Sequence, residues 1–252
     1  MATSVDLNAD LGEGYGPWEM GDDAALMAVI TSANVACGGH AGDPDVMARA
    51  MQMAIDNGVG IGAHPGFADR QGFGRRRLPL KRAEIVNLIR YQVGAAQGMV
   101  RALGADLHHI KLHGALSNMC AEDADLARDC FAAALSVAPE AILMAQSATG
   151  LEEAARSLDA SWVGEIFADR AYNTDGTLVN RAEPGAILRD PDEVAARVVD
   201  MVQQGSVPTI KGTRLNVAVD TICVHGDTAE AVALARAVRT GLEAAGVTLK
   251  RF

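Results

Sequence analysis

Histidine is the residue type whose positions in this chain point most clearly to chemistry. Four of the six histidines directly follow short apolar runs, where strands are expected to end: His40, His64, His113 and His225. An imidazole can act as a general acid, a general base or a metal ligand near neutral pH. A single histidine is more often structural, but four at equivalent positions favour a common site. His108 and His109 begin a run instead and are expected to be structural or surface residues.

Acidic and amide side chains alternate along the first expected strand. Asp6, Asn8 and Asp10 should point to one side of this strand, and Glu13 should lie in the loop that follows it. Because a buried carboxylate is costly unless it is paired or coordinated, Asp10 and Glu13 are candidate catalytic residues. Asp6 or Asn8 could instead tie neighbouring strands together at the bottom of a barrel.

Lys111 lies two residues before His113, so both side chains should share one face of a strand. A lysine beside histidines in a pocket could neutralise a substrate carboxylate or a developing oxyanion. The alternative is a structural salt bridge to Asp10 or Asp6.

Two further cationic segments could contact an anionic substrate. Asp169 and Arg170 end the sixth expected strand and could orient a charged substrate or form an ion pair. Arg75 is the first of three consecutive arginines after a glycine-bearing loop, and it could cover an anion. A solvated basic loop is the alternative for that run.

Metal and nucleotide binding are less clearly indicated. A divalent metal could be held, with open coordination positions, by Asp10, His40, His64 and His113. The sequence has no HExxH pair, so a metal requirement stays open. It also has no GxxxxGK[ST] motif, and Gly12, Gly14 and Gly16 form only GxGxG, which suits either a backbone anion cradle or a flexible loop.

The elements that must position these residues alternate between two kinds of segment. Short apolar runs typical of strands lie at residues 5–9, 33–37, 59–63, 107–112, 141–145, 162–167 and 221–224. Amphipathic segments predict helices at residues 44–57, 83–103, 122–137, 191–204 and 228–245. The first of these helices is well delimited, because Asp43 suits the N-cap, Pro44 the first turn and Gly58 the stop.

This alternation predicts an α/β fold with a parallel sheet covered by helices. A distorted (β/α) barrel of about seven parallel strands is favoured over an open doubly wound sheet, with residues 1–252 forming a single domain. The polar clusters follow the strands, so they should meet at the carboxyl ends of the barrel strands. The aperiodic segments 65–80 and 170–189 are expected to be functional loops.

Composition excludes several classes of protein. The chain is 49% hydrophobic and 21% charged, with a net charge of −10, which argues against disorder and against a nucleic-acid-binding surface. Its start lacks a signal-peptide pattern and no apolar run reaches membrane-spanning length, so a cytoplasmic protein is expected. The scattered cysteines are expected to be reduced packing residues: Cys37, Cys120, Cys130 and Cys223.

Several long motifs, in fixed order from end to end, resemble the LamB/YcsF family: DLNADLGEGYG, NVACGGHAGDP, GAHPGFADRQGFGRR, IKLHGALSN, EIFADRAYNTDGTLVNR and ICVHGD. The resemblance implies a distorted barrel related to glycoside hydrolase and deacetylase barrels. It also implies ATP-dependent hydrolytic opening of 5-oxoproline to L-glutamate in a complex with two partners, the 5-oxoprolinase subunits B and C. ATP is therefore an expected cosubstrate, and a divalent metal stays open.

The polar residues of the family motifs are retained in this chain: Asp10, Glu13, His40, Asp43, His64, Lys111 and His113. The departures are Ala9, Gly39, Leu112 and Ser117, which could shift substrate preference or partner contacts. The candidate catalytic residues are Asp10, Glu13, His40, His64, Lys111 and His113. The candidate substrate-binding residues are Asn8, Asp43, Arg75, Asp169, Arg170 and His225.

Two other functions stay open at this point. One is a metal-dependent amide hydrolase or polysaccharide deacetylase that needs no ATP, which the Asp/His set would suit. The other is a binding or regulatory subunit whose partners perform the chemistry, which the missing nucleotide motif would suit.

Overall fold

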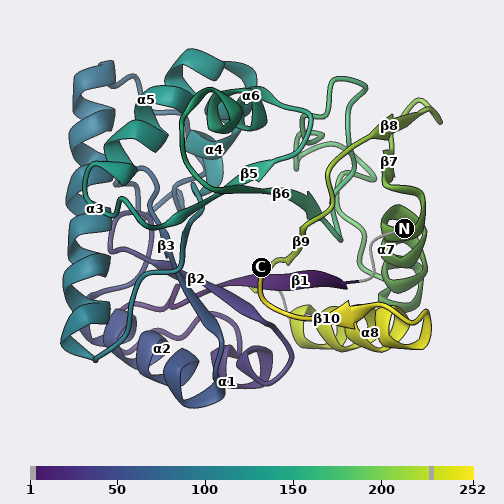
Figure 1. The fold of residues 1–252 in the computed structure, drawn as a ribbon, viewed down its shortest axis with the longest axis horizontal. Coiled ribbons are helices and arrows are strands. Elements are labelled where there is room, and N and C mark those ends of the chain that lie inside the picture. The colour runs from purple at the N-terminus through teal and green to yellow at the C-terminus, as the bar shows by residue number, and fades with distance from the viewer. Residues whose placement is uncertain (1–3, 227–229) are drawn as a thin grey trace.

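Seven parallel strands close into a barrel in the order β1-β2-β3-β4-β5-β6-β9, with β9 pairing back to β1 (Figure 1). The computed structural model describes residues 4–226 and 230–252. The strands are β1 (Ser4–Leu11), β2 (Ser32–Ala36), β3 (Gly60–His64), β4 (His109–Ile110), β5 (Ile142–Gln146), β6 (Trp162–Phe167) and β9 (Thr221–Val224). The predicted α/β barrel is confirmed.

Helices surround this barrel (Figure 1). They are α1 (Asp23–Met27), α2 (Pro44–Asn57), α3 (Arg82–Ala102), α4 (Gly114–Glu122), α5 (Ala124–Leu135), α6 (Gly150–Ser157), α7 (Pro191–Gln204) and α8 (Ala231–Ala244). Strand β10 (Thr248–Leu249) pairs with β1, and β7 (Ser206–Pro208) forms an antiparallel pair with β8 (Arg214–Asn216). In the described part of the chain, no helix is long and apolar enough to cross a membrane.

The longer helices lie close to their predicted positions. The helix predicted at 44–57 has the expected cap, because the Asp43 carboxylate accepts hydrogen bonds from the first backbone amides and Gly58 ends the helix with a φ of 67°. The helix predicted at 122–137 is shorter, because Asp123 caps a new helix and separates α4 from α5. Of the helix predicted at 228–245, residues 228–229 lie outside the described residues, as does Asp227 of the ICVHGD motif.

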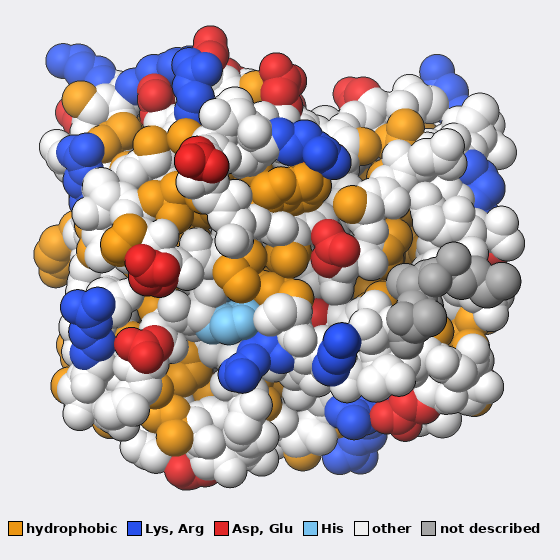
Figure 2. Space-filling model, in the orientation of Figure 1, with side chains coloured by type: hydrophobic (Ala, Val, Ile, Leu, Met, Phe, Trp, Pro, Cys, Tyr) orange, Lys and Arg blue, Asp and Glu red, His pale blue; other side chains and the backbone are white. Residues whose placement is uncertain are grey.

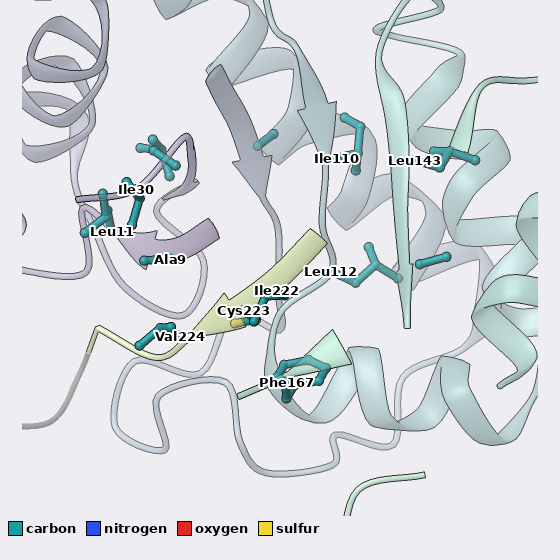
Figure 3. Packing of buried hydrophobic residues seen from close by; sticks show 14 of the residues in the cluster. Ala9, Leu11, Ile30, Ile110, Leu112, Leu143, Phe167, Ile222, Cys223 and Val224 are labelled. Carbon is teal, nitrogen blue, oxygen red and sulfur yellow. The ribbon is translucent and has the colours of Figure 1, made fainter. Parts of the chain in front are cut away.

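The barrel has an apolar outside and a polar inside. Alternate β1 side chains, including Leu7 and Ala9, belong to the hydrophobic core between strands and helices, part of which is shown in Figure 3. The intervening side chains Asp6, Asn8 and Asp10 are also buried but bond across the barrel interior. The sequence alternation of β1 therefore separates packing residues from polar ones.

Hydrogen bonds fill this polar interior. Asp6 accepts hydrogen bonds from the hydroxyls of Thr31, Ser32 and Thr221, which links β1 to β2 and β9. Asn8 donates to Thr221 Oγ1 over 2.7 Å and accepts from Asn34 Nδ2 over 2.8 Å. These contacts match the alternative in which Asp6 and Asn8 tie neighbouring strands together.

Small residues make room for larger polar groups inside the barrel. A Cβ at Gly62 would lie 2.1 Å from Nε2 of the buried His109 ring, so only glycine fits at that point on β3. His109 Nε2 is in turn 2.8 Å from Asn34 Oδ1. The ring of His108 packs beside Phe252, with the ring centroids 4.9 Å apart. Both histidines thus lie in structural settings.

The surface carries charges of both signs. On the face shown in Figure 2, acidic and basic side chains are scattered among apolar and uncharged ones and form no continuous basic area. The four cysteines are buried and form no disulfide, in line with their expected packing role.

Substituting Asp6→Ala should lower the free energy of unfolding by about 1–3 kcal/mol, because it leaves the buried hydroxyl groups of Ser32 and Thr221 without this acceptor. Urea denaturation measures this change. The matched control is Asp159→Ala at an exposed position, which should change stability by less than about 0.5 kcal/mol. Equal effects of the two substitutions would contradict the strand-tying role of Asp6.

Candidate active site

A cavity of about 590 Å³ lies at the carboxyl ends of the barrel strands. Both predicted functional loops border it, the first through Arg75 and Arg77 and the second through residues 177–183. The cavity is of a size that suits a small molecule. Among the candidate residues, those that line it are Asp10, Glu13, His64, Arg75, Lys111, His113, Arg170 and His225.

Lys111 is the buried cation at the base of this cavity. Its Nζ lies 2.9 Å from Asp10 Oδ1 and 2.8 Å from Glu165 Oε1, and 3.0 Å from Cys223 Sγ. Burial alone would lower the pKa of Lys111, but Asp10, the hydrogen-bonded sulfur of Cys223 and Glu165 hold that pKa well above its ordinary value. Lys111 is therefore charged, and the expected salt bridge to Asp10 is present, with a second carboxylate from Glu165.

Asp10 is held in one orientation by its neighbours. Its Oδ1 accepts hydrogen bonds from Lys111 Nζ and from Asn34 Nδ2, the latter over 2.9 Å, while Oδ2 lies 3.4 Å from His64 Nε2. Burial would raise the pKa of Asp10, but His64 and Lys111 outweigh that effect and hold the pKa well below its ordinary value. An ionised carboxylate oxygen therefore faces the histidines at the cavity.

Three histidines and one glutamate gather beside Asp10. The rings of His40 and His113 stack with their centroids 3.5 Å apart, and His113 Nδ1 lies 3.1 Å from His64 Nε2. Glu13 Oε1 lies 3.4 Å from His40 Nε2. Burial is the main cause that lowers the pKa of both His40 and His113 well below the ordinary value, so these two rings are neutral at pH 7.

Two sets of buried side chains place potential metal ligand atoms within 4.8 Å of one another. One contains Glu13, His40, His64 and His113, and the other contains Asp10, Cys223 and His225. The sequence pattern groups Asp10 with the histidines, whereas Glu13 supplies the carboxylate of the histidine set in the structure. In the second set, burial raises the pKa of the Cys223 thiol well above its ordinary value, which disfavours the thiolate that a metal needs.

Asp169 and Arg170 follow β6 but have separate partners. Asp169 Oδ1 pairs with His225 Nδ1 over 2.9 Å. Arg170 donates instead to the backbone carbonyls of Val179, over 2.6 Å, and Ala186. Burial lowers the pKa of Arg170 to about 10, which leaves it charged at neutral pH. Arg170 thus holds the 170–189 loop while adding positive charge to the cavity wall.

Arg75 comes from the other long loop. Its guanidinium carbon lies 4.8 Å from the centroid of the Phe73 ring. Because it also lines the cavity, Arg75 brings a second arginine to the mouth of the site. The cavity therefore combines the ionised Asp10 carboxylate at its base with cationic groups on its walls.

Three candidate substrate-binding residues, Asn8, Asp43 and Asp169, do not line the cavity, and neither does the candidate catalytic residue His40. Asn8 is fully buried in the barrel interior, below Lys111, from whose Nζ it accepts a hydrogen bond over 3.2 Å. Asp43 caps α2 and also accepts a hydrogen bond from Gly16 N over 2.6 Å. That bond anchors the glycine loop to a carboxylate, which is the wrong charge for an anion cradle. Substrate binding by Asn8 and Asp43 stays a prediction.

Sequence reasoning missed Glu165, the second partner of Lys111. A signal for it exists, because Glu165 sits within the apolar run of β6 and a carboxylate there must be buried. It is also four residues before Asp169, so both should face the same side of an extended segment. The backbone carbonyl of Phe73, which accepts from His113 Nε2 over 2.8 Å, has no comparable sequence signal.

The fold and the site together define a (β/α)-barrel protein with a small polar cavity at the carboxyl ends of its strands. The sequence model of the LamB/YcsF family matches residues 5–252 of this chain. The chain therefore belongs to this family. The A subunit of 5-oxoprolinase from Ruegeria pomeroyi is 58% identical over 250 residues, covering 99% of each chain.

Solved structures agree with this assignment. The lactam utilization protein from Thermus thermophilus is 41% identical, with a TM-score of 0.92 over 99% of this chain and 100% of that chain. A GH113 β-1,4-mannanase shares the fold alone, at 9% identity and a TM-score of 0.53 over 96% of this chain and 99% of that chain. The predicted relation to glycoside hydrolase barrels is confirmed at the level of the fold.

Replacing Lys111→Met should lower the free energy of unfolding by about 3–5 kcal/mol, because Asp10 and Glu165 would lose the cation between them. The loss should be smaller in a Glu165→Gln background, with a coupling energy of about 0.5–3 kcal/mol from a double-mutant cycle in urea. Lys211→Met, at an exposed position, is the control. Additive effects of the two buried substitutions would contradict the pairing.

Proposed function

We propose that this chain is the A subunit of an ATP-dependent 5-oxoprolinase and acts with partner subunits B and C to hydrolyse 5-oxo-L-proline to L-glutamate. The observation that carries the proposal is the 58% identity, over 99% of both chains, to a protein named as the A subunit of 5-oxoprolinase. The solved relative named a lactam utilization protein supports it, because 5-oxoproline is a five-membered lactam.

The reaction breaks the ring amide bond, and water supplies a hydroxyl group to the carbonyl carbon and a proton to the nitrogen. A lactam is a poor electrophile, so the coupled hydrolysis of ATP supplies the driving force. A general base must then accept a proton from the attacking water. Asp10 Oδ2 is the proposed base, because it is ionised, faces the cavity and lies 3.4 Å from His64 Nε2.

The substrate also carries a carboxylate, which needs a cation. Arg75 is the proposed partner, since it lines the cavity and a guanidinium binds a carboxylate through two parallel hydrogen bonds. Arg170 is less suited to direct contact, because it already donates to two loop carbonyls. Lys111 is likewise balanced by two carboxylates, so the proposal makes it a positioning residue for Asp10.

The proposal assigns the lactam to this cavity. The sequence has no GxxxxGK[ST] motif, so no motif of that kind places the nucleotide on this chain. The proposed requirement for partner subunits agrees with the name of the Ruegeria pomeroyi relative, which makes that protein one subunit of a larger enzyme.

Mixing the purified chain with subunits B and C should release glutamate from 5-oxoproline together with ADP, and omitting this chain should abolish release. An Asp10→Asn variant should lower kcat by about 10²–10⁴-fold, because it removes the base while keeping the shape of the side chain. Coupled glutamate and ADP assays measure both effects.

The matched control for that variant is Asp159→Asn, which alters an exposed carboxylate and should leave kcat unchanged. Circular dichroism checks that both variants fold. Glutamate release without this chain would contradict the proposal. Glutamate release that needs this chain but no ATP would favour the amide hydrolase alternative instead.

A further inference from the structure

The hydrogen bonds of His64 and His113 determine which ring nitrogen of each carries the proton. His64 Nδ1 lies 2.8 Å from the backbone carbonyl of Lys111, and His113 Nε2 lies 2.8 Å from the backbone carbonyl of Phe73. A carbonyl oxygen only accepts hydrogen bonds, so both of these ring nitrogens must be donors. In a neutral imidazole the other nitrogen then bears a lone pair.

Those two lone-pair nitrogens face each other. His64 Nε2 and His113 Nδ1 are 3.1 Å apart in a buried setting. Two acceptors at that distance repel, so a positively charged species between them is needed. It can be either a proton shared by the two rings or a metal cation.

The groups around this pair favour a metal over a proton. Glu13 Oε1 lies 3.8 Å from His113 Nδ1 and 3.4 Å from His40 Nε2. Within the described part of the chain, neither ring nitrogen of His40 has a hydrogen-bond partner, although the ring is buried. A proton held between the two rings would satisfy His64 and His113, and also Asp10 Oδ2, which lies 3.4 Å from His64 Nε2. Only a metal would also engage His40 and Glu13.

The separations fit a coordination sphere. Ligands at 2.0–2.1 Å from a tetrahedral ion stand roughly 3.3–3.4 Å apart. Three of the six separations, 3.1, 3.4 and 3.8 Å, bracket that value, and the four ligand atoms lie within 4.8 Å of one another. The rings of His40 and His113 are stacked, so they must tilt for both lone pairs to point at one ion. The backbone carbonyls behind His64 and His113 are the kind of outer partner that orients metal-binding imidazoles.

We propose that Glu13, His40, His64 and His113 form a site for one divalent transition metal of the Zn²⁺ class. Three imidazole nitrogens and one carboxylate suit Zn²⁺ or Co²⁺, whereas Mg²⁺ and Ca²⁺ prefer sets made of oxygens. When bound beside the cavity, such an ion would polarise a carbonyl oxygen or lower the pKa of water only by taking that group as a fifth ligand. The site does not rest on the proposed 5-oxoprolinase activity, because it is defined by this chain alone.

Metal binding by the isolated, chelator-stripped chain tests the site directly. Titration with Zn²⁺ in a calorimeter should give about one equivalent, and Co²⁺ should give the visible absorption of a low-symmetry nitrogen and oxygen site without sulfur-to-metal charge transfer. Added Zn²⁺ should also raise Tm. A chain that binds neither ion would overturn the proposal, whatever the outcome of the glutamate assay.

Three variants locate the site. His40→Ala and Glu13→Gln should each weaken Zn²⁺ affinity by at least about 100-fold and abolish the Tm increase, and Glu13→Gln keeps the side-chain volume in case the smaller residue disturbs folding. His108→Ala removes a histidine that lies just before β4, whereas His113 lies after it, and this variant should bind Zn²⁺ like the original chain. Unchanged affinity in both site variants would contradict the proposed ligand set.

Discussion

The buried ion pairs of Lys111 are the interaction on which the rest of this structure depends. A lysine inside a barrel must be compensated, and it is compensated by Asp10 from β1 and Glu165 from β6. The backbone of the same residue continues the barrel wall, because its amide donates to Ala63 O at β3. Its carbonyl accepts from His64 Nδ1. One residue therefore connects the packing of the strands with the orientation of the acid and histidine groups.

The ion pairs of Lys111 belong to a larger polar network inside the barrel. Asp6, Asn8 and Asp10 occupy one face of β1, and each bonds to groups on neighbouring strands rather than to solvent. The contacts of Asp6 and Asn8, in the lower part of the barrel, hold neighbouring strands together. The upper end of this face of β1, at Asp10, opens to the cavity. The hydrogen bonds of the barrel interior are therefore continuous with those of the candidate active site. Substitutions in the interior should alter the positions of the site residues as well.

Much of this could be predicted from local sequence patterns. The barrel, the long helices and the shared face of Asp6, Asn8 and Asp10 follow from hydrophobic periodicity and capping residues, which are local properties. Glu165 was missed because its partner is distant in the chain, although its place in an apolar run was a signal. The loop after β1 brings Glu13, and not Asp10, into the set of three histidines, and the path of a loop is not a local sequence property. The carbonyls of Phe73 and Lys111 are backbone groups, so no residue type reveals their contacts with the histidines.

The central claim is that the cavity of this chain holds the lactam. A crystal structure of the chain assembled with subunits B and C, in the presence of 5-oxo-L-proline and a non-hydrolysable ATP analogue, tests it most directly. We expect the lactam in the cavity, with its carboxylate at Arg75 and its ring amide beside Asp10 and His64. Lactam bound in one of the partners while this cavity is empty would contradict the claim and make the chain a binding or regulatory subunit.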